Sequence, residues 1–223
     1  MANIVLVPGA FHGGWWYNPI IPDLRKAGHS VYSVTPTGMG ERRHLRGLAI
    51  NLDTHIEDLV NIFEHEKIDD AILVGHSYAG MIITGAAGRL QGRIRSLVYL
   101  DAIVPENGKS QWQHLPPAWH DLFTSASPDG INAYPDPNMD KRTAPQPLAT
   151  LLQPLQIAPG AFDVRHRHYV LADGFVGSPF PAIYDRLEKE GGWTMRRVPY
   201  GHDFMNEDAG YFRDFLLEIA ATP

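Results

Sequence analysis

Short apolar runs alternate with amphipathic segments along most of the chain, and this alternation gives the first prediction of the fold. The apolar runs are rich in β-branched residues and are bounded by glycine, proline or polar residues, as buried strands usually are. Such runs predict six strands, at 3–9, 29–35, 70–75, 95–102, 166–173 and 193–200.

Helices are predicted between most of these strands. One apolar helix face repeats at i, i+3, i+4 and i+7 through 54–66, as Ile56, Leu59, Val60 and Phe63. The small residues of AGMIITGAAG at 79–88 suit a tightly packed helix, and further helices are predicted at 19–28, 180–190 and 207–220. Because the strands are almost continuously apolar, the pattern predicts an α/β fold with a parallel sheet covered by helices on both faces.

Residues 103–165 interrupt this alternation. They contain ten of the eighteen prolines, between Pro105 and Pro159, together with two tryptophans. The segment has no convincing strand and at most short helices, and a structureless stretch of this length is implausible inside a compact core. We therefore expect a cap at 103–165, inserted between the fourth and fifth strands of a core made of 1–102 and 166–223.

Composition narrows the class of protein. At 223 residues the chain is long enough for one domain with a substantial core, and 44% of its residues are hydrophobic. The formal net charge is -6 with mixed signs, so a nucleic-acid partner is not expected. No apolar run approaches the ~20 residues of a membrane span and no signal peptide is recognisable, so we expect a cytoplasmic protein without a membrane partner. A homodimer remains an open alternative.

The clearest chemical signal is the stretch ILVGHSYAGM at 72–81, where a serine follows a predicted strand and precedes a predicted helix. This is the context in which G-x-S-x-G forms a nucleophile elbow, a strained turn that needs small neighbours. Gly75 satisfies the first glycine position. Ala79 adds only a methyl at the second, and Gly80 follows it. The alternative interpretation is a helix-capping serine, but the strand context favours Ser77 as a nucleophile.

A serine nucleophile needs a base and an acid. His202 follows the last predicted strand, and the order Ser…Asp…His is the one expected of this architecture. Asp173, at the end of the fifth strand, is the first choice for the acid that orients His202, and Asp101, at the end of the fourth, is the second. The chain has no cysteine, and its histidines form no clear ligand set, so no metal or other cofactor is expected.

The loop VPGAFHGGWW at 7–16 follows the first predicted strand. In such folds the oxyanion hole uses the backbone N–H after the nucleophile, here Tyr78, and one from this first loop, for which Ala10 is the candidate. Further residues are expected to contribute to the substrate pocket, although core packing is an alternative for each aromatic one: Gly9, Phe11, His12, Trp15, Tyr78, Trp112 and Trp119.

Taken together, these motifs resemble the α/β-hydrolases, and within them the plant methylesterase and hydroxynitrile-lyase group with its bacterial esterase relatives. The resemblance rests on VLVPGAFHGGWWY, AGHSVYSVTPTGMGER, LVGHSYAGM, LVYLDAIVPENGKS and the final GHDFM. It implies about six parallel strands in the order 2-1-3-4-5-6, and the same Ser77, His202 and Asp173 as catalytic residues.

Two departures from that group bear on the reaction. The first loop has Pro8-Gly9 where the group usually has His-Gly, or His-Thr in some lyases. The lyases typically have a lysine after the catalytic histidine to handle cyanide, whereas this chain has Asp203. We therefore expect a serine hydrolase that cleaves a carboxylic ester of a small, mostly apolar molecule. The alternatives are lyase-like or other non-hydrolytic chemistry on the same residues, and a ligand-binding protein with vestigial activity.

Overall fold

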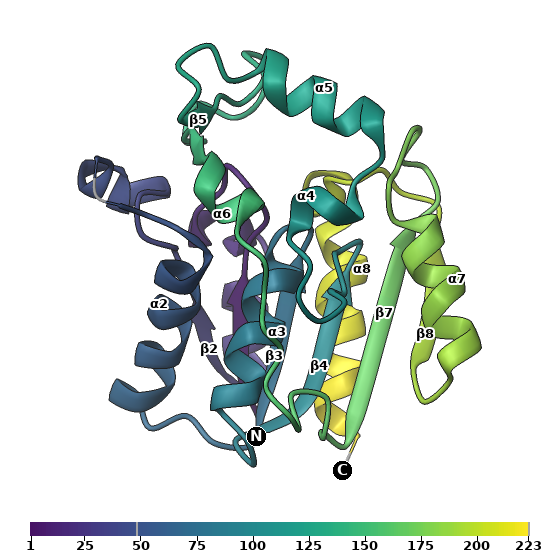
Figure 1. Cartoon of the computed structure of the whole chain (residues 1–223). Helices are drawn as coiled ribbons and strands as arrows, with labels where there is room; N and C mark the ends of the chain where they lie inside the picture. The colour runs from purple at the N-terminus through teal and green to yellow at the C-terminus, as the bar shows by residue number, and fades with distance from the viewer. Residues whose placement is uncertain (48, 223) are drawn as a thin grey trace.

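A six-stranded parallel sheet forms the centre of the computed structural model, which describes residues 1–47 and 49–222 (Figure 1). Its strands are β1 (Asn3–Val7), β2 (Ser30–Ser33), β3 (Ala71–His76), β4 (Ile94–Leu100), β7 (His166–Ala172) and β8 (Thr194–Val198). They lie in the order β2-β1-β3-β4-β7-β8, and every neighbouring pair is parallel. Counted within this sheet, that order is 2-1-3-4-5-6, so the predicted architecture is confirmed.

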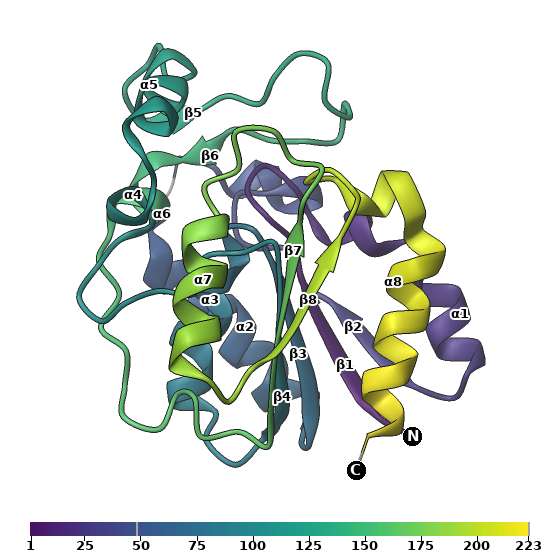
Figure 2. The ribbon, with the colours of Figure 1, turned by 90° about the vertical axis from the view of Figure 1, so that its right-hand side faces the viewer.

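Helices cover both faces of the sheet (Figure 2). One face carries α1 (Ile21–Lys26) and α8 (Phe204–Ala221), and the other carries α2 (Leu52–His65), α3 (Ala79–Arg89) and α7 (Pro181–Glu190). Two short 3-10 helices, η1 (Gly14–Tyr17) and η2 (Gly40–Leu45), follow β1 and β2. Within the described ranges, no helix combines the length and apolarity needed to cross a lipid bilayer.

The two faces have separate apolar cores because side chains alternate along each strand. In β1, Val5 and Val7 pack into the core under α2 and α3, whereas Ile4 and Leu6 pack into the core under α1 and α8. All of these β1 side chains are fully buried. A strand with an apolar core on each side must be apolar at every position, which explains the near-continuous apolar runs in the sequence.

The 103–165 segment contains short elements: α4 (Gln111–His114), α5 (Pro117–Ser125), α6 (Leu148–Leu152) and a two-stranded antiparallel ribbon of β5 (Asn132–Ala133) and β6 (Gln146–Pro147). These elements lie beyond the carboxyl ends of the sheet strands (Figure 1). The rest of the segment, 153–165, runs back beside α3 to the start of β7, where the Pro159 carbonyl accepts a hydrogen bond from Gln91. This last part is therefore the return connection that a parallel strand requires.

A close crossing of two backbones fixes the junction between β3 and α3. The Ile103 N–H donates to the Ser77 carbonyl at 3.1 Å, which brings the chain leaving β4 across the first turn of α3. A Cβ added at Gly80 would lie 1.8 Å from the Ile103 carbonyl oxygen. Ala79, one residue earlier, is accommodated and fully buried. After the serine, the position that requires glycine is therefore 80 and not 79.

Gly80→Ala should lower the free energy of unfolding by about 1–3 kcal/mol, because the new methyl must displace the Ile103 backbone. Urea unfolding followed by circular dichroism measures the change. The matched control is Gly210→Ala in α8, where the nearest atom to the added Cβ lies at 3.3 Å on a side chain. Equal stability of Gly80→Ala and the wild type would contradict the crossing.

Candidate active site

Ser77 occupies a strained turn between β3 and α3. Its φ is +55°, in the left-handed region that non-glycine residues seldom adopt and that costs on the order of 1–3 kcal/mol. Glycines clear the space around it: a Cβ on Gly9 would lie 3.0 Å from the Ser77 Cβ, and one on Gly75 would lie 3.0 Å from the Ala79 carbonyl oxygen. The turn therefore presents the Ser77 hydroxyl above the carboxyl end of the sheet.

Three strand ends bring a hydroxyl, an imidazole and a carboxylate into line. The Ser77 Oγ lies 2.9 Å from the His202 Nε2, and the His202 Nδ1 lies 2.6 Å from the Asp101 Oδ2. A carboxylate only accepts, so Nδ1 carries the proton and Nε2 is free to accept from the serine. The structure thus brings together the predicted Ser77 and His202 in the geometry of a nucleophile and its base.

The carboxylate in this line is Asp101, the second choice from the sequence, and Asp173 was the wrong first choice. Asp101 is fully buried, and its Oδ1 accepts from the Ala172 N–H at 3.0 Å. Asp173 is half exposed, and its carboxylate accepts instead from Arg197 at 2.8 Å. Both follow a strand, but a φ of +43° at Asp101 sends its chain into a different turn. The sequence carries no signal that separates the two, because an apolar run precedes each aspartate, VYL before Asp101 and YVLA before Asp173.

Aromatic rings and a buried imidazole hold His202 in place. The rings of Phe175 and Phe180 stack on it at 4.7 and 5.4 Å between centroids. His76 Nε2 lies 3.0 Å from the His202 carbonyl oxygen, so this nitrogen donates. Burial lowers the pKa of His76 well below its usual value, and His202 lowers it further. A neutral His76 therefore supports the backbone of His202 through this hydrogen bond. The Ser77 hydroxyl contacts His202 and not His76.

A cavity of about 180 Å³ opens above Ser77. Among the residues predicted for the pocket, Gly9, Phe11 and Trp119 line it, and so does Ala10. Sequence reasoning missed the remaining wall, because it comes from short helices, loops and chain far away in the sequence: Gln111, Leu115, Phe123, Met139, Pro179 and Phe180. Apart from Ser77, His76, His202 and Gln111, the residues that line the cavity are glycine or have apolar side chains.

Four other residues predicted for the pocket have different roles. His12 Nδ1 contacts the Ala10 carbonyl at 2.8 Å. The Cζ atom of the Arg142 guanidinium lies 4.0 Å from the centroid of the Trp15 ring. The ring of Trp112 stacks on His120 with 4.4 Å between centroids. The side chain of Tyr78 is buried beneath the turn. For Trp15, Trp112 and Tyr78 the packing alternative is correct, and His12 does not line the cavity.

Two backbone N–H groups flank the serine, on Ala10 and on Tyr78. In the described part of the chain neither N–H has a hydrogen-bond acceptor. The loop that carries Ala10 is held from the 103–165 segment: the Phe11 N–H donates to the Gln146 side chain at 3.2 Å, and the Phe11 carbonyl accepts from Ala144 at 2.9 Å. Phe11 itself has a φ of +70°, so these bonds maintain an uncommon backbone conformation.

A buried polar network lies under Tyr78, and the sequence did not reveal it. The Tyr78 hydroxyl lies 2.9 Å from Nδ1 of His55, whose Nε2 contacts the Thr37 carbonyl at 3.0 Å. A carbonyl only accepts, so Nε2 holds the proton and Nδ1 accepts from Tyr78. Asp58 in turn accepts from the N–H and hydroxyl of Thr37 and pairs with Arg42. Burial lowers the pKa of His55 to about 4, so this histidine is neutral at pH 7.

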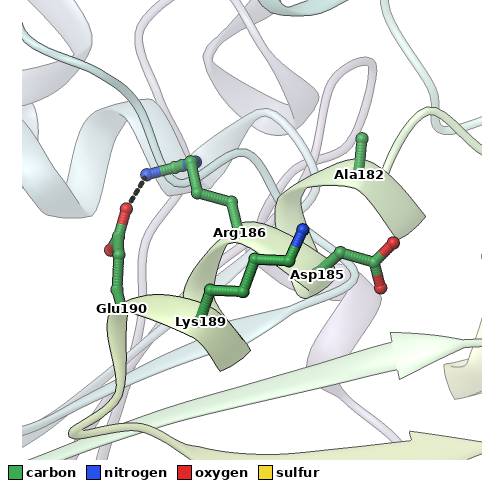
Figure 3. A pocket seen from close by; sticks show the side chains of 5 residues that line it. All are labelled: Ala182, Asp185, Arg186, Lys189 and Glu190. Carbon is green, nitrogen blue, oxygen red and sulfur yellow. Dashed lines mark hydrogen bonds and ion pairs between the residues drawn. The ribbon is translucent and has the colours of Figure 1, made fainter.

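Away from Ser77, a shallow hollow lies on the outer side of α7 (Figure 3). Its side chains are charged or small, and Arg186 forms an ion pair with Glu190 at 3.0 Å. The hollow shares no lining residue with the cavity above Ser77. Across residues 1–47 and 49–222, no group of three or more His, Cys, Asp or Glu side chains is placed to hold a metal ion.

Known sequences resemble this chain over most of its length. A model of the alpha/beta hydrolase family matches residues 4–215. A carbendazim hydrolyzing esterase from Nocardioides sp. (strain SG-4G) is 44% identical over 227 residues, which cover 92% of this chain and 94% of that protein. An alpha-hydroxynitrile lyase from Arabidopsis thaliana is 34% identical over 109 residues, 47% of this chain and 41% of that protein. The predicted resemblance is confirmed.

Solved structures agree on the fold. An extracellular alpha/beta-hydrolase from a Paenibacillus species superposes with a TM-score of 0.85 at 18% identity and covers 98% of both chains. A pyrethroid hydrolase from Sphingobium faniae JZ-2 gives a TM-score of 0.77 at 18% identity, over 100% of this chain and 98% of that one.

The neutral state of buried His55 predicts a loss of stability in acid. Its pKa is about 4 in the folded protein against about 6.5 when unfolded, so the unfolded chain gains a proton first as the pH falls. The contribution of neutral His55 to the free energy of unfolding is complete above pH 6.5. It declines as the pH falls toward 4, by up to about 1.4 kcal/mol per pH unit.

Urea unfolding at pH 7 and pH 5 tests this expectation. His55→Gln should reduce the difference in stability between the two pH values, whatever it costs at pH 7. The control, Tyr78→Phe, removes the hydrogen bond without removing the titrating group, so it should lower stability by a similar amount at both. An unchanged pH dependence in His55→Gln would assign the acid sensitivity to other groups.

Proposed function

The chain belongs to the alpha/beta hydrolase family, and from that premise we propose that it is a serine esterase that forms an acyl-enzyme on Ser77. Its 44% identical relative supports ester hydrolysis. The observation that carries the proposal is the continuous line from the Ser77 Oγ through His202 to the buried Asp101 carboxylate. The substrate is a carboxylic ester of a small, mostly apolar molecule, in keeping with the apolar walls of the cavity.

The first half of the reaction acylates the serine. His202 Nε2 takes the proton of Ser77 as its Oγ attacks the ester carbonyl carbon, and the carbonyl oxygen becomes an oxyanion. The backbone N–H groups of Ala10 and Tyr78 donate to that oxyanion, and Tyr78 also precedes α3, whose positive dipole end favours the charge. The intermediate then expels the alkoxide, which leaves as an alcohol with the proton from His202.

The second half releases the acid. Water enters where the alcohol left, and His202 Nε2 removes a proton from it as its oxygen attacks the acyl carbon. Collapse of the second intermediate breaks the bond to the Ser77 Oγ, and the serine recovers its proton from His202. The Asp101 carboxylate accepts the hydrogen bond from the Nδ1–H of His202 throughout, and it stabilises the imidazolium that forms in each half.

Lyase-like chemistry on the same residues is the alternative within enzymes, and one relative is an alpha-hydroxynitrile lyase. Asp203, directly after His202, argues against a cyanide product because its carboxylate would repel an anion. That carboxylate accepts from Nε1 of Trp16 at 2.8 Å. A ligand-binding protein with vestigial activity is the other alternative, and the aligned hydroxyl, imidazole and carboxylate argue against it.

Ser77→Ala should reduce kcat/KM for 4-nitrophenyl acetate by at least about 10³-fold, because the attacking oxygen is removed. A fluorophosphonate probe should label Ser77 in the wild type, as peptide mass spectrometry can show, and should leave the variant unlabelled. Carbendazim is a second test substrate, given the relative's name. Full activity in Ser77→Ala would refute the acyl-enzyme, and an unlabelled wild type that turns over a non-ester would support the lyase alternative.

Asp101→Asn should lower kcat by about 10³–10⁴-fold with the fold intact, because the amide does not keep His202 in the tautomer that carries its proton on Nδ1. The matched control is Asp173→Asn, which alters an exposed contact with Arg197 and should retain wild-type kcat. Steady-state kinetics on 4-nitrophenyl acetate compares the two. A large loss in Asp173→Asn with normal activity in Asp101→Asn would reverse the assignment of the acid.

A further inference from the structure

The turn that carries Ala10 is held at its central peptide group. The His12 N–H donates to the Gly9 carbonyl at 3.3 Å and closes a β-turn. Its middle residues are Ala10 and Phe11, and the φ of +70° at Phe11 is one that favours glycine at this place in a turn. Nδ1 of His12 donates to the Ala10 carbonyl at 2.8 Å. The Phe11 N–H, on the same peptide group, donates to Oε1 of Gln146 at 3.2 Å. These bonds hold an orientation of the peptide that the Phe11 side chain by itself disfavours.

The side-chain amide of Gln146 is bonded at both of its ends. Its Nε2 donates to the Thr150 hydroxyl oxygen at 2.6 Å, and that hydroxyl donates its own proton to the Pro147 carbonyl at 2.6 Å. The amide cannot turn over, because its NH₂ group would then face the Phe11 N–H, donor against donor. Gln146 and Thr150 are both fully buried, so the loss of either bond leaves an unpaired polar group inside the protein.

Thr150 extends these contacts to the second proposed oxyanion donor. Burial raises the pKa of Tyr78, and the Thr150 hydroxyl, which lies against the Tyr78 hydroxyl, lowers it by a smaller amount. The Tyr78 hydroxyl also donates to Nδ1 of His55 at 2.9 Å. The far end of the Tyr78 side chain is therefore fixed. We refer to Gln146 and Thr150 as the bridge, since they connect the turn at Phe11 with Tyr78.

The bridge lies outside the cavity above Ser77. The described residues that line this cavity include neither Gln146 nor Thr150. The bridge therefore acts on a reaction indirectly, by setting where two backbone N–H groups point. Donors to an oxyanion contribute most when they are fixed in advance, because their hydrogen bonds strengthen as the carbonyl oxygen gains charge. A change in the bridge should consequently act on the transition state more than on the bound ester.

We propose that the bridge positions the oxyanion hole, by fixing the N–H groups of Ala10 and Tyr78 relative to each other. Gln146 is the positioning residue on the Ala10 side, and Thr150 is the one on the Tyr78 side. This inference rests on the proposed esterase function, because the oxyanion forms in that reaction. Both bridge residues belong to the 103–165 segment, which thus takes part in the chemistry as well as in the cavity wall.

Four variants test the bridge against a comparable contact elsewhere. Gln146→Met keeps most of the side-chain volume and removes both hydrogen bonds. Thr150→Val removes the hydroxyl to which Gln146 donates, whereas Thr150→Ser keeps it. The matched control is Gln153→Met. Oε1 of Gln153 accepts from the Asp53 N–H at 3.3 Å, so this glutamine also ties the 103–165 segment to the core, but at the start of α2.

Gln146→Met should lower kcat for 4-nitrophenyl acetate by about 10–100-fold and leave KM within about twofold, because misplaced donors weaken bonds that form in the transition state. Thr150→Val should lower kcat by about tenfold, and Thr150→Ser should recover most of that loss. Gln146→Met combined with Thr150→Val should lose no more than Gln146→Met alone, since both act through one bridge. Gln153→Met should keep the wild-type kcat.

An inhibitor separates positioning from a loss of folded enzyme. The carbonyl carbon of 1,1,1-trifluoroacetone bonds to the Ser77 Oγ, His202 takes the serine proton, and the carbonyl oxygen becomes an oxyanion. The inhibition constant is independent of the amount of folded enzyme. It should rise in Gln146→Met by the same factor by which kcat/KM falls. A fall in activity at an unchanged inhibition constant, or an equal loss in Gln153→Met, would overturn the proposal.

Amide NMR spectra separate the bridge from the proposed reaction. Gln146→Met should shift the amide resonance of Tyr78 and Thr150→Val that of Ala10, whereas Gln153→Met should shift neither. If the wild type neither cleaves 4-nitrophenyl acetate nor binds the ketone but these shifts occur, the esterase proposal fails and the coupling of the two N–H groups stands. If each bridge variant alters only the amide on its own side, the bridge fails whatever the enzyme cleaves.

Discussion

The left-handed turn at Ser77 is the constraint on which the rest of the site depends. A non-glycine residue keeps this conformation only when its surroundings hold it there. Here the Ser77 N–H donates to the Leu100 carbonyl, and its own carbonyl accepts from Gly80 and Ile103. The strand before the turn, the helix after it and the chain leaving β4 therefore meet at one residue. Small side chains around the turn are a consequence of that meeting.

The same turn ties the chemistry to the parallel sheet. In parallel strands all carboxyl ends lie at one edge, so residues that follow β3, β4 and β8 come together although they are far apart in the sequence. Ser77, Asp101 and His202 are those residues. The buried carboxylate between β4 and β7 has both oxygens occupied, one by His202 and the other by the Ala172 N–H. It orients the imidazole because it has no freedom to turn away.

The 103–165 segment acts on the site through few contacts. It supplies Gln146 and Ala144, which hold the backbone of Phe11 beside the candidate oxyanion donor. It also supplies part of the apolar wall above Ser77, namely Leu115, Trp119, Phe123 and Met139. Its helices and its two-stranded ribbon are short and lie beyond the carboxyl ends of the sheet strands. The segment thus shapes part of the cavity above Ser77, whereas the sheet aligns Ser77, His202 and Asp101.

The sequence by itself determined the sheet, its helices and the positions of Ser77 and His202. Periodicity locates buried strands, and a residue that follows a strand of a parallel sheet must lie at its carboxyl edge. Tertiary structure decided between Asp101 and Asp173, since both follow strands and only local backbone angles and burial direct one carboxylate toward His202. It also decided that Phe123 and Met139, and not Trp15 or Trp112, face the cavity. Such contacts arise from the packing of short helices and loops against distant residues, and no repeating pattern along the sequence records them.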